Sequence, residues 1–403
     1  MRRLRAKALI ACLSLCIAIL AGAATALQVT PEPDFARYED CSQEIHDAGG
    51  HMLRAYLTAD QRWRMATHTD DLPKLYWRML LAYEDKRFYS HRGVDLLALG
   101  RALYQLVRYG RPMSGASTLS MQVARLLGPP RTRGIATKIQ QLLLAIKIER
   151  RLTKKQILDV YATLAPLGGN VEGVRAASLL YFQKEPRDLT LAEAATLIAI
   201  PQMPEGRRPD RFPERARRGR DRVIKRMMDL QIIRTSVGRA AMAAPLEADR
   251  HGARFLAPHL SDRLRREYPG RRIIRTLVSA PLQRQAERVA SSALHALPSD
   301  TNVAIVIIEN KSSSVRAYVG GADYFSSSRA GQVDLVEAVR SPGSALKPLI
   351  YGMAFERLIV HPDTIIADQQ TSFGDYEPKN FSGNYTGEIR SARPWLNRST
   401  SRP

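Results

Sequence analysis

The chain has 403 residues, of which 45% are hydrophobic and 25% charged, and its formal net charge is +22. This composition excludes a disordered or fibrous chain and fits about two globular domains. The positive charge predicts an anionic partner: nucleic acid, a phosphate-bearing substrate or an acidic membrane surface. The three cysteines, Cys12, Cys16 and Cys41, cannot build a disulfide framework or a metal cluster.

The N-terminus carries a second strong signal. A basic segment, 1–7, precedes an uncharged run over 8–27, which at about 1.5 Å per residue spans about 30 Å, one bilayer core. Acidic residues follow the run, and this asymmetry predicts a cytoplasmic tail, a single-pass anchor and an exported remainder. A cleaved signal peptide is the alternative, with Ala24-Thr25-Ala26 as its cleavage site. Both interpretations argue against nucleic acid as the partner.

The middle of the chain is predicted to be mainly helical. Residues 28–70 are expected to form a juxtamembrane connector with short strands, and a helical domain follows over 71–230. Residues with capping or helix-starting chemistry predict helices over 95–108, 118–127, 137–150 and 153–161, from 190 onward, and over 213–228.

The composition changes after the helical domain. A basic, mostly helical linker is predicted over 231–296. The β-branched run Val303–Ile308 and the segment Val315–Val319 then predict a hairpin. This hairpin indicates a second, sheet-containing domain over 297–403.

The segment Glu84–Asp95 is the most informative part of the sequence, because charged residues, a glycine and the aromatic residues Phe88 and Tyr89 crowd together in it. Buried charges need partners, and the aromatic rings would waste apolar area in a solvated loop. The segment therefore predicts the floor of a polar cleft. The second segment with clustered small and polar residues is Gly115–Gln122.

These two segments resemble the first two signature motifs of the family 51 peptidoglycan glycosyltransferases, the class A penicillin-binding proteins. The resemblance covers roughly residues 45 to 390. It implies a mainly α, lysozyme-like glycosyltransferase domain after one N-terminal transmembrane helix, followed by an incomplete α/β penicillin-binding transpeptidase domain. It also implies a bacterial inner (cytoplasmic) membrane location with the catalytic domain outside, on the periplasmic side. The implied partners are lipid II, the nascent lipid-linked glycan, inner-membrane lipids and other cell-wall synthases.

Glu84 is the candidate catalytic base. A carboxylate in a partly desolvated cleft can take a proton from an attacking alcohol. The resemblance implies that Glu84 deprotonates the 4-hydroxyl of the acceptor N-acetylglucosamine. That oxygen then attacks C1 of the muramyl sugar with inversion. A structural salt bridge to Lys86 or Arg87 is the alternative for this glutamate.

The leaving group implied by the resemblance is a polyprenyl diphosphate, so cationic donors should converge on it. Lys138 and Gln141 share one face of a predicted helix, beside an apolar stripe that begins at Ile139. Helix capping is the alternative for the hydroxyl residues. The candidate substrate-binding residues are Ser117, Thr118, Gln122, Arg125, Lys138 and Gln141.

The chain departs from the family at Gln141, where most members carry a second glutamate. Glutamine cannot hold a negative charge or bind a divalent cation well. No metal ligand is therefore predicted, although a divalent cation (Mg²⁺ or Mn²⁺) stays an open alternative. Gln141, Met121 and Arg125 are similar to the penicillin-binding protein 1C branch of the family. The glycine-rich segment Gly168–Gly173 resembles a further family motif and fits either a close approach to ligand or a tight turn.

Ser344 and Lys347 form a Ser-x-x-Lys pair, similar to the acyl-serine motif of penicillin-binding transpeptidases. The Ser-x-Asn and Lys-Thr-Gly motifs that such enzymes need do not appear in the chain. The tail from Arg393 can be read in another frame as a peptide that contains Ser-Leu-Asn. We therefore expect a frameshift truncation, with Ser344 a vestigial nucleophile, Lys347 vestigial beside it, and no acylation by penicillin.

The sequence as a whole predicts a peptidoglycan glycosyltransferase that polymerises lipid II into glycan strands and releases polyprenyl diphosphate. Three alternatives stay open: a bifunctional glycosyltransferase and DD-transpeptidase, a non-catalytic cell-wall scaffold, and a lysozyme-like hydrolase that uses the same glutamate.

Overall fold

The computed structural model describes residues 21–22, 25–109, 117–128, 134–252, 254–380 and 383–391. The chain divides into two compact units, Met1–Val336 and Glu337–Pro403. The predicted anchor over 8–27 and the tail from Arg393 lie largely or wholly outside the described residues. Within the described part, no helix combines the length and the apolar character that crossing a bilayer requires.

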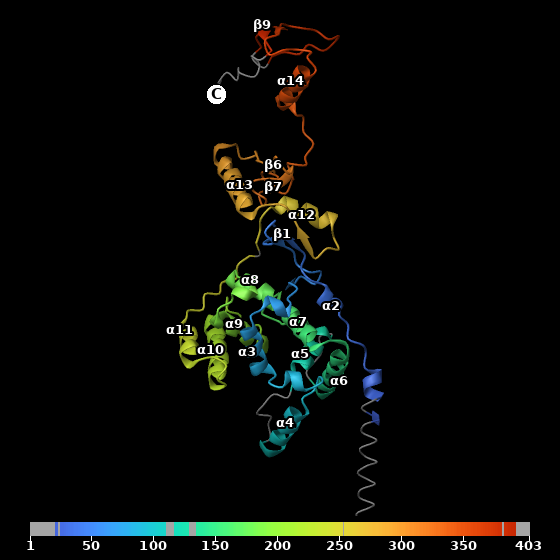
Figure 1. Ribbon diagram of the computed structural model, residues 1–403, viewed down its shortest axis with the longest axis vertical. Helices are drawn as coiled ribbons and strands as arrows, with labels where there is room; N and C mark the ends of the chain where they lie inside the picture. Colours follow the sequence, from blue (N-terminus) through green and yellow to red (C-terminus); the bar gives the residue numbers. More distant parts are fainter. Residues whose placement is uncertain are drawn as a thin grey trace, which may run out of the picture. The chain divides into compact units, whose positions relative to one another are not determined.

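The first unit is mainly helical around one large apolar core. Figure 1 shows α3 beside α9 and α10, and α5 beside α6 and α7. The helices that enclose the core are α3 (Lys74–Glu84), α5 (Leu119–Leu127), α6 (Ile135–Arg151), α7 (Lys154–Leu164), α8 (Val174–Phe182), α9 (Leu191–Ala199) and α10 (Pro213–Asp229). Further helices of this unit are α2 (Ala36–Glu39), α4 (Leu96–Tyr109), α11 (Thr235–Ala243), α12 (Pro258–Glu267) and α13 (Ala280–Ala293).

The predicted helix starts are confirmed, because the capping side chains bind the backbone as expected. Thr118 accepts a hydrogen bond from the Met121 N–H at 3.2 Å. Thr153 and Thr190 begin α7 and α9 with capping boxes. Asp95 accepts the N–H of the first turn of α4 at 2.9 Å. Short 3₁₀ turns connect the helices: η1 (Thr69–Asp71), η2 (Phe88–Ser90), η3 (Pro186–Asp188), η4 (Ile200–Gln202) and η5 (Leu294–Ala296).

Short strands bring distant parts of the first unit together. β1 (Glu44–His46) pairs antiparallel with β2 (Met52–Ala55) and parallel with β5 (Ile273–Arg275). The segments predicted as connector and linker therefore share one sheet. β3 (Trp63–Arg64) pairs in parallel with β4 (Val171–Glu172).

A smaller apolar core underlies the three-stranded sheet, and it includes Ile45, Leu53 and Tyr318. Tyr318 belongs to an antiparallel hairpin of β6 (Ile305–Glu309) and β7 (Ser314–Val319). The hairpin predicted from the β-branched run is thus confirmed.

The second unit contains η6 (Gly343–Leu346), α14 (Lys347–Glu356) and an antiparallel pair of strands, β8 (Ile365–Asp368) and β9 (Gly387–Arg390). Of its described residues only Ser391 is buried. The apolar side chains of α14 are exposed, as Leu349 shows at 64%.

Helix α6 buries a different face from the predicted one. The predicted stripe begins at Ile139, which is 53% exposed, whereas Ala145 and Ile148 are fully buried. Gly93 has φ +95° and lies so close that a Cβ there would meet the Ala145 carbonyl carbon at 2.9 Å. Helix α6 therefore packs through the small side chain of Ala145 against Gly93, which has no side chain.

Candidate active site

Glu84 ends α3, and its side chain is half-buried. Its two carboxylate oxygens accept hydrogen bonds from Gln122 Nε2 and Gln202 Nε2, each at 2.9 Å. The described residues show no ion pair from Glu84 to Lys86 or Arg87. Two neutral amides therefore orient the carboxylate without neutralising it, which leaves it able to accept a proton.

The rest of the polar segment fixes the end of α3 to the helices that follow. Asp85 is buried, accepts the Leu119 N–H at 2.8 Å and contacts His91 Nε2 at 3.0 Å. Arg87 donates two hydrogen bonds, of 2.8 and 2.7 Å, to Asp95. Since these contacts reach the starts of α4 and α5, most of the charges in the segment build the cleft rather than face a ligand.

Gln202 was not among the predicted site residues, yet it connects Glu84 to a buried cation. Its Nε2 donates to Glu84, and its Oε1 accepts from Arg207 Nη1 at 3.2 Å. Arg207 is 7% exposed and also donates to the Ala199 carbonyl at 2.5 Å. Burial and the nearby Arg222 lower the pKa of Arg207, and Glu84 acts in the opposite direction. The sequence offered one weak signal, a polar residue in the short turn that follows an apolar helix.

Tyr161 lies beneath the site. Its side chain is 2% exposed, and its hydroxyl has no hydrogen-bond partner in the part of the chain that the structure describes. Burial raises the pKa of Tyr161 well above its ordinary value; the charge of Glu84 raises it further, whereas Arg125 lowers it. The Glu84 carboxylate and the Arg125 guanidinium therefore both act electrostatically on the buried Tyr161 hydroxyl.

A cavity of about 1080 Å³ adjoins α5, α6 and the segment before α2. Ser117, Arg125, Lys138 and Gln141 all line it. The structure thus brings these predicted substrate-binding residues together around one space. Two cations and two neutral hydrogen-bonding side chains suit an anion that carries several oxygens. We call this space the α5–α6 cavity.

The side chains of the other two predicted substrate-binding residues bind groups of the protein itself. Gln122 binds Glu84, as described above. Thr118 is buried, and its hydroxyl donates to the Gly93 carbonyl at 2.6 Å while it caps α5. The position of Thr118 agrees with the helix-capping alternative.

The glycine-rich segment agrees with the tight-turn alternative. Gly173 has φ +87°, and a Cβ there would meet the Thr163 carbonyl oxygen at 2.5 Å. Thr163 exchanges hydrogen bonds with the Thr67 backbone. Both positions therefore serve the fold beneath the site.

No group of three or more histidine, cysteine or carboxylate side chains among the described residues could hold a metal ion. Glu32 lines the α5–α6 cavity but is paired with Lys147 at 2.9 Å and Arg151 at 3.0 Å. Gln141 adds only a neutral amide. Asp34, the second carboxylate that lines the cavity, accepts the Ala36 N–H at 2.9 Å. The described residues of the cavity therefore do not fit the convergent oxygen ligands that Mg²⁺ prefers.

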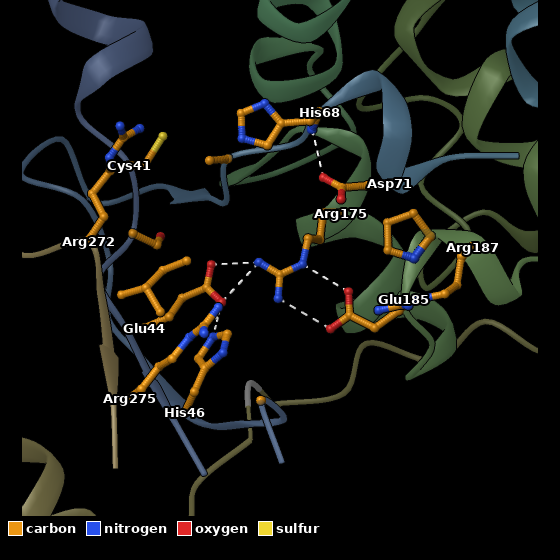
Figure 2. A pocket seen from close by; sticks show the side chains of 15 residues that line it. Cys41, Glu44, His46, His68, Asp71, Arg175, Glu185, Arg187, Arg272 and Arg275 are labelled. Carbon is orange, nitrogen blue, oxygen red and sulfur yellow. Dashed lines mark hydrogen bonds and ion pairs between the residues drawn. The ribbon is translucent and has the colours of Figure 1, made fainter. Parts of the chain in front are cut away.

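A separate charged pocket, of about 540 Å³, lies where β1 and β5 meet α8 and η3 (Figure 2). Arg175 occupies its centre and binds Glu44 at 2.7 Å and Glu185 at 2.9 Å. Burial alone would raise the pKa of Glu44, but His46 and Arg175 together lower it below its ordinary value. Because the charges of Arg175, Glu44 and Glu185 satisfy one another, this cluster joins the sheet to the helices.

The predicted acyl-serine pair lies in the second unit. Ser344 is in η6, Lys347 begins α14, and both side chains are exposed. The backbone N–H of Lys347 bonds to the carbonyl of Ser344. In the described part of this unit, no hydrogen bond or ion pair holds either side chain in a catalytic orientation.

Two family models match the chain: "Transglycosylase" over residues 49–228 and "Penicillin binding protein transpeptidase domain" over residues 303–402. Penicillin-binding protein 1C of Escherichia coli (strain K12) is 38% identical over 341 residues, which are 84% of this chain and 44% of that protein. Penicillin-binding protein 1F of Bacillus subtilis (strain 168) is 30% identical over 365 residues, 86% of this chain and 50% of that protein. The chain thus spans half or less of the length of these relatives.

Among solved structures, penicillin-binding protein 1A from Haemophilus influenzae matches 87% of this chain and 58% of its own, with a TM-score of 0.35 and 17% identity. That likeness is too slight to support an argument about fold or site.

Proposed function

The chain belongs to the class A penicillin-binding proteins, and on that premise we propose that it is a peptidoglycan glycosyltransferase that polymerises lipid II. One observation carries the proposal. Glu84 is half-buried and held by Gln122 and Gln202, and Arg125, which lines the α5–α6 cavity, lies three residues after Gln122 on α5. This arrangement supplies a base next to a site for a departing anion.

The reaction follows from these residues. Glu84 takes the proton from the acceptor 4-hydroxyl as its oxygen forms a bond to C1 of the muramyl sugar. The bond from C1 to the diphosphate breaks, and its electron pair leaves with the polyprenyl diphosphate. Attack opposite to the leaving group inverts C1. Arg125 and Lys138 stabilise the leaving charge, and Gln141 and Ser117 donate hydrogen bonds to its oxygens.

We assign this reaction to the helical domain over 71–230, in a chain anchored in the inner membrane by 8–27 with its catalytic domain outside. The charge asymmetry around 8–27 supports this orientation. Helix α4 also presents Leu96 and Leu97, at 75% and 72% exposure, which would contact lipid more favourably than water. An acceptor and a donor that are both lipid-linked would reach such a domain at the bilayer surface.

The bifunctional alternative adds a DD-transpeptidase to the same chain. The exposed Ser344 and Lys347 and the uncovered apolar side chains of α14 favour glycosyl transfer as the one activity. Acyl transfer from a serine needs a positioned base and hydrogen-bond donors around the developing oxyanion.

Incubation of the purified chain with labelled lipid II tests the proposal. We expect glycan strands with inverted configuration at the muramyl C1, and one polyprenyl diphosphate released for each new bond. Formation of free reducing disaccharide instead would identify a hydrolase. Binding of lipid II without any product would identify a scaffold, and either result would contradict the proposal.

A further inference from the structure

Strand β5 forms one edge of the three-stranded sheet, because β1 pairs with one side of it and no strand in the described part of the chain pairs with the other. The carbonyl of Arg272 and the N–H of Thr276 bond to β1, at 2.7 and 2.9 Å. Since every second residue of a parallel strand bonds to the same neighbour, the backbone groups of Ile273 and Arg275 face away from β1. Within the described ranges, no hydrogen bond reaches them from that side.

The residues of this edge are exposed and mostly basic. Ile273 is 47% exposed, and the neighbouring Arg271, Arg272 and Arg275 are exposed as well. An open edge can pair with a strand of another chain. A second copy of β5 would set arginines against arginines, and like charges opposite each other destabilise a pair of strands. The edge therefore favours a strand that carries carboxylates.

An apolar groove of about 420 Å³ lies beside this edge, lined by residues of α12, β5 and β7. We call it the β5 groove. Ile274, Leu260 and Val278 form its buried floor, and Leu277, which also lines it, is 58% exposed. No acidic residue lines the groove in the part of the chain that the structure describes. Its charged lining residues are Arg263, Arg271 and Arg275.

The charges of these arginines are largely unbalanced. Arg263 is 3.8 Å from the carboxylate of Glu267, which is half exposed. Arg271 lies over the ring of Tyr268, 5.4 Å from its centre. Among the described residues, no carboxylate forms an ion pair with Arg271 or Arg275. The β5 groove therefore attracts negative charge, and its apolar floor distinguishes it from a basic surface that only water covers.

The two faces of β5 have different surroundings. Ile274 lines the β5 groove, whereas Ile273 lines the charged pocket, where Arg272 and Arg275 lie along one side (Figure 2). Successive side chains of a strand point to opposite faces of its sheet. A strand added to β5 would therefore place its alternate side chains over an apolar surface and over a cationic one.

We propose that the edge of β5 and the β5 groove bind an extended acidic segment of another protein, which pairs with Ile273 and Arg275 as an added strand. Apolar side chains of the segment pack into the groove, and its carboxylates bind Arg271, Arg272 and Arg275. None of these residues lines the α5–α6 cavity, so the inference is independent of the proposed reaction. A lipid headgroup would use the arginines but would leave the backbone groups of β5 unpaired.

Fluorescence anisotropy of a labelled peptide of alternating valine and glutamate measures this binding. Arg271→Glu combined with Arg275→Glu should raise the Kd of the peptide about tenfold or more. Arg266→Glu combined with Arg284→Glu makes the same change in net charge outside the groove and should leave the Kd within about twofold of the parent value. A peptide with lysine in place of glutamate should not bind. Failure of the acidic peptide to bind the parent, or equal losses in the two double variants, would overturn the inference.

A second experiment separates strand pairing from the attraction of charge alone. Ile273→Pro removes an N–H that faces away from β1, a change that an edge strand tolerates, and it should raise the Kd of the peptide about tenfold. Ile273→Val keeps the N–H and should bind as the parent does, with thermal unfolding as the check on both folds. Methylation of every peptide N–H should give the same loss with the unchanged protein. Binding that survives both changes would overturn strand pairing, and binding of phosphatidylglycerol vesicles in place of the peptide would identify a headgroup site instead.

Discussion

Glu84 and Ser344 were both predicted from short motifs, but the two regions around them differ physically. Glu84 lies at the end of a helix in a large apolar core, and two amides orient its carboxylate. Ser344 lies on a turn whose neighbouring helix leaves its apolar side chains in solvent. A motif identifies the residues that chemistry requires, whereas the packing around them decides whether they are held in a reactive geometry.

The largest expected effect comes from removing the base. Glu84→Gln keeps a side chain of the same shape but cannot accept the proton, so kcat for lipid II polymerisation should fall about 10²- to 10⁴-fold. Ser344→Ala should leave kcat unchanged. Equal losses in the two variants, measured by gel analysis of labelled glycan, would remove the contrast between the regions.

Core packing gives the next effect. Leu119 is fully buried at the start of α5, so Leu119→Ala should lower the free energy of unfolding by about 2–5 kcal/mol. Leu349→Ala on the exposed face of α14 should change it by less than about 0.5 kcal/mol. Urea denaturation of both variants measures the difference, and a comparable loss in Leu349→Ala would show that α14 is covered in solution.

Gln202 should affect the rate of catalysis through its hydrogen bond to Glu84. Gln202→Ala removes one of the two donors to the carboxylate and the link to Arg207, so we expect kcat to fall about 10- to 100-fold through misorientation of the base. Lys86→Ala, a change of an exposed side chain two residues after Glu84, is the control. The interpretation fails if kcat in Gln202→Ala matches that of the control.

The cap of α5 should have a moderate effect on stability. Thr118→Ala removes the hydroxyl that accepts the Met121 N–H and donates to Gly93, at a cost of about 1 kcal/mol. Thermal unfolding measures this cost, and Thr118→Ser should recover most of it. If Thr118→Ala left stability intact but raised the KM for lipid II, the hydroxyl would belong to the substrate site instead.

For the last test we expect no reaction at all. A fluorescent penicillin should not acylate the chain, since Ser344 and Lys347 are exposed and neither side chain is positioned. The measurement is in-gel fluorescence with a full-length penicillin-binding protein as positive control. A labelled band that disappears in Ser344→Ala would restore the bifunctional alternative.

Helix starts and the hairpin could be predicted from sequence because their causes are local. The hydroxyls of Thr153 and Thr190 bind backbone groups within the same turn, so no distant contact decides them. The face of α6 could not be predicted, because several of its apolar residues compete for burial. The close approach of Gly93, which is distant in sequence, favours the burial of Ala145.

Part of the candidate site could not be predicted from the sequence either. Glu84 and Gln122 were found by their motifs, but the hydrogen bond between them depends on the angle between α3 and α5. Gln202 approaches Glu84 only because η4 follows a helix that packs on α3. The pairing of β1 with β5 joins strands of three residues each, too short to leave a pattern in the sequence.

The most direct test of the role of Glu84 measures binding and turnover in one preparation of Glu84→Gln. We expect the Kd for lipid II to stay within about twofold of the parent value while single-turnover bond formation falls by at least about two orders of magnitude. Loss of lipid II binding in proportion to loss of rate would contradict the account, because Glu84 would then hold the substrate rather than take its proton.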